Sequence, residues 1–277
     1  MKKKKSISTI LTILVFLTGV GFLLYPTVSD RWNQAHQSRV IATYTKEVEQ
    51  LDDSDNEEMI QAARRYNEKL RERADHWNLS KKAKKKYESL LDISGTGIMG
   101  YIEIPKIKCS LPVYHGTDEG ALQIAIGHLE GSSLPVGGES THCVLSGHRG
   151  LPSARLFTDL DQMQEGDIFI LHILDEKLAY EVDQIKVVLP EEMSDLEVIE
   201  GEDLCTLVTC TPYGINSHRL LVRGHRTDYV ETVETKVTEE KEVQTKETEI
   251  WIVAAVGILV VIVIGAVFIR KRRKQKR

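Results

Sequence analysis

The chain has 277 residues, of which 42% are hydrophobic, so it is long enough for one domain with a sizeable core and attached segments. Its formal net charge is −5, but 11 of its 36 basic residues lie in two terminal tails, and all 41 acidic residues lie between them. The other 25 basic residues leave the central part with a net charge of −16. This acidity argues against a nucleic-acid-binding protein and suits a solvated exterior domain.

Two uncharged apolar runs bracket the central part. Ile7 to Leu24 contains 18 residues and follows four lysines, and Ile250 to Ile269 contains 20 residues and precedes a tail with seven basic residues. About 20 apolar residues cross a bilayer, and basic flanks mark its cytoplasmic side. We therefore predict two membrane spans with both termini cytoplasmic. A cleaved signal peptide is the alternative for the first run, which lacks a small-x-small cleavage site and is longer than a typical signal-peptide core.

A polar stretch with helical patterning follows the first run. Ser38 to Leu51 and Glu57 to Arg73 place apolar residues at helical spacing, which predicts two helices on the outside of the domain. Asp75-His76-Trp77 then interrupts the pattern. A Trp in a charged stretch needs an explanation, and the simplest one is that Trp77 packs this segment onto the core.

From Gly97 onward the pattern changes to short strands separated by Gly, Pro, Asn and Asp. Two short helices are expected among them, at Asp118–Ile126 and Ser153–Leu160. Many short strands at modest spacing are typical of a closed barrel or a sandwich, so the predicted fold class is all-β. The predicted strands are Ile98–Ile104, Leu111–Tyr114, Thr141–Ser146, Asp167–Leu174, Leu178–Leu189, Leu204–Cys210 and Arg219–Arg223.

The last two predicted strands carry the strongest chemical signal. Leu204–Cys210 is rich in β-branched residues, and Arg219–Arg223 resumes after a loop rich in Pro, Gly and Asn. Antiparallel pairing would place Cys210, at the end of the first strand, beside Arg219, at the start of the second. A fixed positive charge favours a thiolate and can hold a developing oxyanion, so this pair predicts acyl-transfer chemistry.

A nucleophilic cysteine needs a proton donor for its leaving group, and the chain holds nine histidines. His148 is favoured locally because it follows an apolar strand and lies between Gly147 and Gly150, on a loop at a strand end. A lone His is nevertheless more often structural than catalytic. No Cys-x-x-Cys, His-x-x-x-His or His-Glu-x-x-His spacing occurs, so we expect no metal site, and no glycine-rich loop suggests another cofactor.

The other three cysteines have a simpler interpretation as small buried apolar residues. These are Cys109, Cys143 and Cys205. Cys205 and Cys210 are five residues apart on one predicted strand and point to opposite faces, so they should not pair. A Cys109–Cys143 disulfide remains an open alternative, because an exterior domain permits it.

Several separated motifs resemble those of one enzyme family. Thr206 to Cys210 reads Thr-Leu-Val-Thr-Cys and is followed nine residues later by Arg219, which resembles the TLXTC…R signature of sortases, the cysteine transpeptidases of Gram-positive surfaces. Gly147-His148-Arg149-Gly150 and Tyr114-His115-Gly116 resemble the pilin-polymerising class of that family, class C. The resemblance implies a closed eight-stranded barrel, close to the number of strands predicted here.

The resemblance also implies roles for individual residues. Cys210 would attack the Thr–Gly bond of a Leu-Pro-x-Thr-Gly-like sorting motif, His148 would protonate the leaving amine, and Arg219 would hold the carbonyl oxygen. The acceptor in this class is a lysine of the next pilin, and the partners are pilins and other surface proteins with sorting signals. Two alternatives stay open. One is a general wall-anchoring sortase with a peptidoglycan-stem amine as acceptor, and the other is a non-catalytic membrane-anchored assembly module.

Pilin-type sortases carry an Asp-Pro-aromatic lid before the barrel, and Asp75 and Trp77 match it. His76 replaces the Pro, which removes the stiffening that Pro would give. In this interpretation Asp75 approaches Arg219 and Trp77 covers Cys210. The predicted segments, in chain order, are a cytoplasmic tail at 1–6, a transmembrane helix at 7–25, an extracellular helical region at 26–92 with the lid at about 74–79, the catalytic barrel at 93–226, a polar linker at 227–249 without a sorting pentapeptide, a transmembrane helix at 250–269 and a cytoplasmic tail at 270–277.

Overall fold

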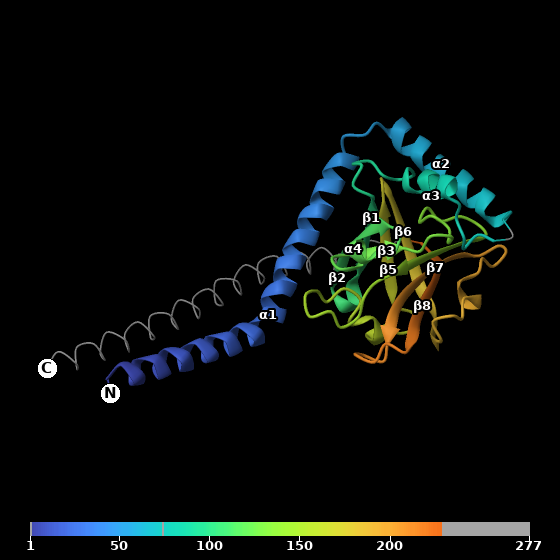
Figure 1. The fold of residues 1–277 in the computed structure, drawn as a ribbon. Helices are drawn as coiled ribbons and strands as arrows, with labels where there is room; N and C mark the ends of the chain where they lie inside the picture. The colour runs from blue at the N-terminus through green and yellow to red at the C-terminus, as the bar shows by residue number, and fades with distance from the viewer. Residues whose placement is uncertain (1, 74, 229–277) are drawn as a thin grey trace. The chain divides into compact units, whose positions relative to one another are not determined.

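The computed structural model describes residues 2–73 and 75–228 and contains a closed β-barrel of eight strands (Figure 1). The strands follow one another around the barrel in the order β1-β2-β3-β4-β7-β8-β6-β5. This confirms the predicted all-β barrel. The strand bounds are β1 Ile98–Ile104, β2 Cys109–His115, β3 Ile126–His128, β4 Thr141–Ser146, β5 Ile168–Ile173, β6 Glu176–Val188, β7 Asp203–Thr211 and β8 His218–Thr227.

Most pairs of neighbouring strands are antiparallel, but two are parallel. β2 pairs in parallel with β3, and β4 with β7. β4 is buried over its first five residues, Thr141 to Leu145, because its apolar run faces the barrel interior on one side and covering segments on the other. The parallel β4–β7 pair matters most for function, since it places the loops that follow both strands at the same end of the barrel.

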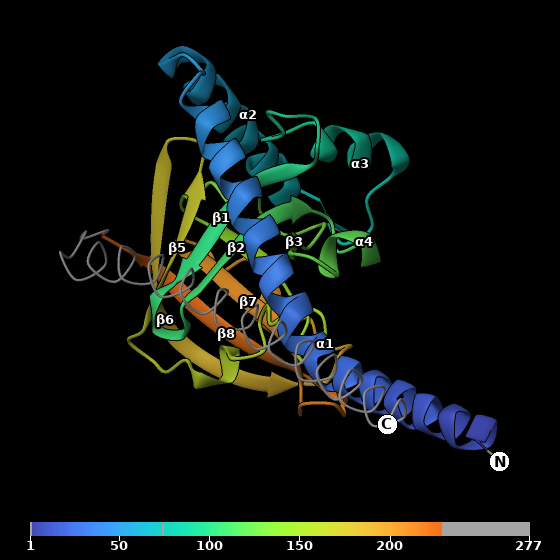
Figure 2. The ribbon, with the colours of Figure 1, turned by 90° about the vertical axis from the view of Figure 1, so that its left-hand side faces the viewer.

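The described residues also form four α-helices: α1 Lys2–Val48, α2 Asp53–Arg71, α3 Lys81–Glu88 and α4 Glu119–Leu122. The later part of α1 lies against β1 and β2 (Figure 2). Its Tyr44 is 2% exposed, donates to the carbonyl of Met99 at 3.0 Å and accepts from the amide of Leu174 at 2.8 Å. These buried hydrogen bonds connect the helix to β1 and to the turn that follows β5.

Helix α2 leads directly into the segment predicted to be a lid. Its inward face carries Ile60, Ala63 and Leu70, all buried, at the three- and four-residue spacing of an amphipathic helix. Asn67 on the same face donates to the carbonyl of Leu134 at 3.1 Å and accepts from its amide at 2.7 Å. The helix is therefore held on the loop between β3 and β4, and its C-terminal end is fixed beside that loop.

The structure corrects four expectations about local elements. The predicted helix at Asp118–Ile126 is limited to α4, and Ile126 begins β3, which pairs with residues 113–115 of β2. Ser153–Leu160 forms turns rather than a helix, because α1 satisfies its backbone: the Asp30 carboxylate accepts from the amide of Arg155 at 2.8 Å. Helix α3 lies where none was predicted, and α1 continues through Pro26 into the helix expected at Ser38–Leu51.

The membrane prediction is tested only in part. Among the described residues, one helix is long and apolar enough to cross a membrane, and it lies near the N-terminus within α1, at Leu11–Val48. The predicted second span at 250–269, the linker at 227–249 beyond residue 228 and the tail at 270–277 lie outside the described residues.

Candidate active site

The ends of three adjacent strands bring together the residues that the sequence motifs selected. In the antiparallel β7–β8 pair, Cys210 lies directly opposite Arg219. In the parallel β4–β7 pair, Ser146 lies opposite Val208, and the amide of Gly147 donates to the carbonyl of Val208 at 3.0 Å. Cys210 lies two residues beyond that pair on β7, and His148 lies two residues beyond it in the loop that follows β4, so both residues lie at the same end of the barrel.

His148 keeps a ring nitrogen available for chemistry. Its side chain is half-buried, and its Nε2 is shielded from solvent without a hydrogen-bond partner among the described residues. Its backbone is fixed, since its carbonyl accepts from the amide of Phe157 at 3.1 Å. Buried polar atoms normally have a hydrogen-bond partner, so this unpartnered ring nitrogen indicates a group that can exchange a proton with a bound reactant.

Arg219 offers donors rather than a completed ion pair. Its Nη1 donates to the carbonyls of Asn216, at 3.3 Å, and His218, at 3.1 Å. In the part of the chain that the structure describes, no carboxylate pairs with it. The guanidinium is thus steadied by the β7–β8 loop while its remaining N–H groups can hold a negatively charged oxygen beside Cys210.

The remaining cysteines are unsuitable as nucleophiles. All four cysteines are free thiols, so the alternative of a Cys109–Cys143 disulfide is wrong. Burial raises the pKa of the Cys109 thiol to about 12, with a further contribution from Asp159. Cys143 and Cys205 face each other across β4 and β7 and are 2% and 0% exposed, so no substrate reaches them. Cys210, half-buried at a strand end, is the thiol that lies opposite a cation, Arg219, in the strand register.

Comparison with known proteins gives a consistent result. A family model described as "Sortase domain" matches residues 102–227. The crystal structure of sortase C1 from Streptococcus agalactiae is 52% identical in sequence, with a TM-score of 0.68, and the match covers 69% of this chain and 100% of that one. The chain belongs to the sortase family. Its structural relatives place this sortase in class C.

Two further relatives describe the range of the similarity. The structure of sortase C from Streptococcus pneumoniae, whose description concerns catalysis and pilin substrate specificity, is 45% identical with a TM-score of 0.62, and the match covers 70% of this sortase and 100% of that chain. Sortase D of Bacillus subtilis is 31% identical over 130 residues, which are 46% of this chain and 63% of that protein. This chain therefore spans less than two thirds of the Bacillus relative.

The segment after α2 packs on a small apolar cluster that includes residues of β4 and β8. Trp77 packs against a buried cluster that Val208 also contacts, formed by Val144, Val188, Leu196 and Leu221. Val208 and Leu221 face each other one step before the Cys210–Arg219 pair on the same face of β7 and β8. The indole therefore packs on the same apolar cluster as Val208, which lies two residues before Cys210 on β7.

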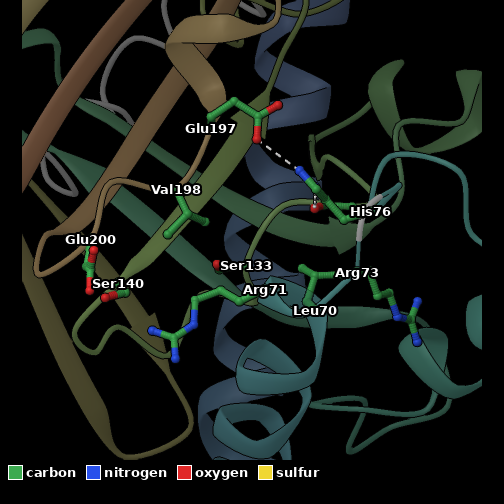
Figure 3. Close-up of a pocket in the computed structure, with 10 residues that line it drawn as sticks. Leu70, Arg71, Arg73, His76, Ser133, Ser140, Glu197, Val198 and Glu200 are labelled. Carbon is green, nitrogen blue, oxygen red and sulfur yellow. Dashed lines mark hydrogen bonds and ion pairs between the residues drawn. The ribbon is translucent and has the colours of Figure 1, made fainter.

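A carboxylate that sequence reasoning did not find holds this segment in place. Glu197, in the connection between β6 and β7, pairs with Nε2 of His76 at 2.9 Å (Figure 3). It also accepts from the indole Nε1 of Trp77 at 2.9 Å. The other ring nitrogen of His76 lies 2.8 Å from the carbonyl oxygen of Gly131. Both nitrogens thus face oxygen acceptors, an arrangement that a protonated imidazole satisfies completely. We call these contacts of His76 and Trp77 with Glu197 and Gly131 the clasp.

The electrostatics of Glu197 agree with this geometry. Burial acts to raise the pKa of the Glu197 carboxyl, but the hydrogen bonds from Trp77 and His76 and the nearby His76 and His142 outweigh it, so the net shift is downward. The carboxylate form is therefore the one that holds the clasp. His76 also lines a cavity of about 540 Å³, together with Arg71, Arg73, Glu200 and other residues (Figure 3). Its lining includes residues of α2 and of the segment after it but not His148, Cys210 or Arg219.

Gly131 has a steric reason to be glycine. Its φ is +94°, and a Cβ at this position would lie 2.5 Å from the carbonyl oxygen of His76 and 2.9 Å from the Cα of Trp77. Asp75 does not behave as the sequence analysis expected: its carboxylate accepts from the Asn78 amide at 3.0 and 3.1 Å, and within the described residues it forms no ion pair with Arg219. The segment is held at His76 and Trp77 instead.

Proposed function

We propose that this sortase polymerises pilins: it cleaves an LPXTG-like sorting motif between Thr and Gly and transfers the acyl group to a lysine amine of a pilin subunit. The observation that carries the proposal is the register of β4, β7 and β8, which aligns His148, Cys210 and Arg219 at one end of the barrel. The similarity to the pneumococcal sortase C, described by its pilin substrate specificity, supports the choice of substrate.

The chemistry follows from these three side chains. The Cys210 thiolate attacks the Thr carbonyl carbon, and Arg219 donates to the oxygen as it becomes negative. The C–N bond to Gly then breaks while His148 gives its proton to the leaving amine, and a thioester remains. In the second half, the lysine amine attacks the thioester, His148 takes a proton from it, and the C–S bond breaks to leave an isopeptide bond and free Cys210.

Membrane attachment would serve this reaction by proximity. We propose that α1 provides one span and residues 250–269 a second, with both termini cytoplasmic and the barrel outside. Holding the enzyme beside membrane-held pilin precursors converts a dilute encounter into one with a high effective concentration.

The acceptor is the part of this proposal that most needs an experiment. Purified residues 26–228 should join a LPXTG-bearing pilin to a second pilin through a lysine side chain, and mass spectrometry of the product should show the isopeptide-linked peptide. Replacing that lysine by arginine should stop the joining without stopping thioester formation. If a peptidoglycan-stem peptide competes successfully against pilin at equal concentration, the sortase is a wall-anchoring enzyme instead.

We also propose that Asp75, His76 and Trp77 form an autoinhibitory lid. In this proposal Trp77, which packs on the same apolar cluster as Val208, blocks the approach of the sorting motif to Cys210, and the clasp holds it in place. A substrate would then supply the free energy that shifts the lid to its open state. The rival interpretation is that Trp77 only packs the segment against the core.

The lid interpretation predicts an effect on thiol access. Asp75→Ala combined with Trp77→Ala should speed labelling of Cys210 by an alkylating reagent with little change in melting temperature. Glu197→Ala should also speed labelling of Cys210, although it leaves the three lid residues unchanged. Glu197 is 48% exposed, so solvent limits its contribution to about 1 kcal/mol, or about fivefold in labelling rate.

The matched control is Glu200→Ala, which removes another carboxylate from the wall of the same cavity. It should leave the labelling rate unchanged. Unchanged labelling in the Asp75 and Trp77 variant, together with a clear loss of thermal stability, would show that Trp77 is a packing residue.

A further inference from the structure

Arg149 follows His148 in the chain and carries a charge in an enclosed place. Its side chain is only 9% exposed, and its Nε is shielded from solvent without a partner among the described residues. Removing a guanidinium from water is costly unless the structure surrounds it with acceptors. The burial of a guanidinium directly after the catalytic histidine is therefore not explained by the solubility that surface charges provide.

The partners of Arg149 come from two separate parts of the chain. Its Nη2 pairs with the carboxylate of Asp161, in the short 3-10 helix at Leu160–Gln162, and its Nη1 donates to the hydroxyl of Thr211 at 3.2 Å. The guanidinium carbon also lies 6.0 Å from the centre of the Tyr213 ring, within the range of a cation–π contact. One side chain therefore spans the loop after β4 and the loop after β7.

The neighbouring glycine completes this connection. Gly150 has a φ of +76°, and a Cβ there would lie 2.9 Å from the Tyr213 ring. The ring thus rests directly on the backbone of Gly150 while Arg149 approaches it as well. The two loops fit together through Arg149 and Gly150 on one side and Thr211 and Tyr213 on the other.

These residues follow the catalytic pair directly in the sequence. Arg149 comes immediately after His148, and Thr211 immediately after Cys210. Before those positions, the two strands are tied by the Thr209 hydroxyl, which donates to the carbonyl of Gly147 at 2.8 Å. The hydrogen bond between Arg149 and Thr211 is a tie on the other side, so His148 and Cys210 are enclosed between two fixed points.

We infer that Arg149 is a positioning residue that holds His148 and Cys210 at the separation and orientation proton transfer requires. Lysine could not replace it, because an ammonium group lacks the planar fork that reaches Asp161 and Thr211 together and the flat face that lies on Tyr213. The inference rests on the proposed cysteine transpeptidation, in which Cys210 attacks the Thr carbonyl carbon and His148 exchanges protons with the leaving and incoming amine nitrogens at that carbon. A displacement of about 1 Å in such a pair reduces the rate about 100-fold.

The test compares variants in the full-length protein. Arg149→Met and Arg149→Lys should each lower kcat for cleavage of a LPXTG peptide, by about 100-fold for Met, while KM changes less than about threefold. Thr211→Val removes one acceptor and should lower kcat about fivefold, whereas Thr211→Ser keeps the hydroxyl and should retain wild-type kcat. Melting temperatures are measured alongside. Thr211→Val keeps the test decisive even when an Arg149 variant does not fold.

A second readout does not depend on the substrate. The rate of Cys210 alkylation against pH reports the relation between the thiol and His148, and its profile should shift in Arg149→Met and Thr211→Val but not in Thr211→Ser. If the wild-type protein cleaves no sorting peptide, the proposed function is wrong. The alkylation profiles would still test whether Arg149 positions His148 and Cys210. Unchanged kcat and an unchanged profile, with or without a lower melting temperature, would overturn the inference, as would a rise in KM alone.

Discussion

Cys210→Ala should abolish peptide cleavage and pilin joining while the barrel stays folded. The side chain is half-buried at the end of β7, and removing one sulfur atom there disturbs no buried contact of the core cluster. Loss of a catalytic nucleophile removes the covalent route, and a drop of at least about 10⁴-fold in kcat is the expected scale. Chromatography of a LPXTG peptide measures the cleavage, and mass spectrometry should find no thioester on the variant.

The other thiols provide the controls for this prediction. Replacing Cys109, Cys143 or Cys205 singly should leave activity largely intact, because these residues do not lie at the Cys210–Arg219 end of the barrel face. Substitution of the fully buried Cys205 should lower thermal stability more than substitution of Cys210, since it leaves a small cavity in the core. Residual cleavage by folded Cys210→Ala would mean that Cys210 is not the nucleophile.

The strands were predictable where local sequence alone determines burial. β1 and β4 have the bounds that the sequence gives, since their apolar residues and flanking turns leave little choice. β3 was not predictable, because its three residues become a strand only by pairing with β2 and β4. Ser153–Leu160 was misread for a related reason. Its buried residues Ala154, Phe157 and Leu160 repeat every three positions like a helix face, but the Arg155 amide bonds to Asp30 of α1 and the Phe157 amide to the carbonyl of His148.

The residues of the candidate site also divide into those that the sequence identified and those that it did not. His148, Cys210 and Arg219 lie in short motifs, and the strand register places them together as those motifs require. The clasp left no such trace, because Glu197 is 121 residues away from His76 and sits in an acidic stretch where nothing distinguishes one carboxylate from the next. The expected Asp75–Arg219 pair came from the family pattern with Pro. With His76 in that place, the imidazole supplies its own contacts, and they determine where the segment docks.

Arg219→Lys should lose most of the activity although the charge is kept. A lysine ammonium is a point charge on a flexible stem and lacks the planar fork with which a guanidinium can donate to an oxyanion while it stays bound to the carbonyls of Asn216 and His218. Loss of one such oxyanion donor costs about 2–4 kcal/mol in transition-state stabilisation, which is about 30- to 1,000-fold in kcat. Single-turnover acylation by a sorting peptide measures this step directly.

The same substitution four residues later on β8 is the matched control for Arg219→Lys. Arg223 lies on the same face of the strand, but both arms of its guanidinium are taken by Asp183, with its Nε at 3.0 Å and its Nη2 at 2.8 Å from the two carboxylate oxygens. Arg223→Lys should therefore lower thermal stability slightly and leave acylation near the wild-type rate. If both variants acylate at the wild-type rate, Arg219 is a docking or structural charge, and the oxyanion must be held by other donors. A loss confined to Arg219→Lys assigns the oxyanion to Arg219, because the two variants share the strand, the face and the chemical change.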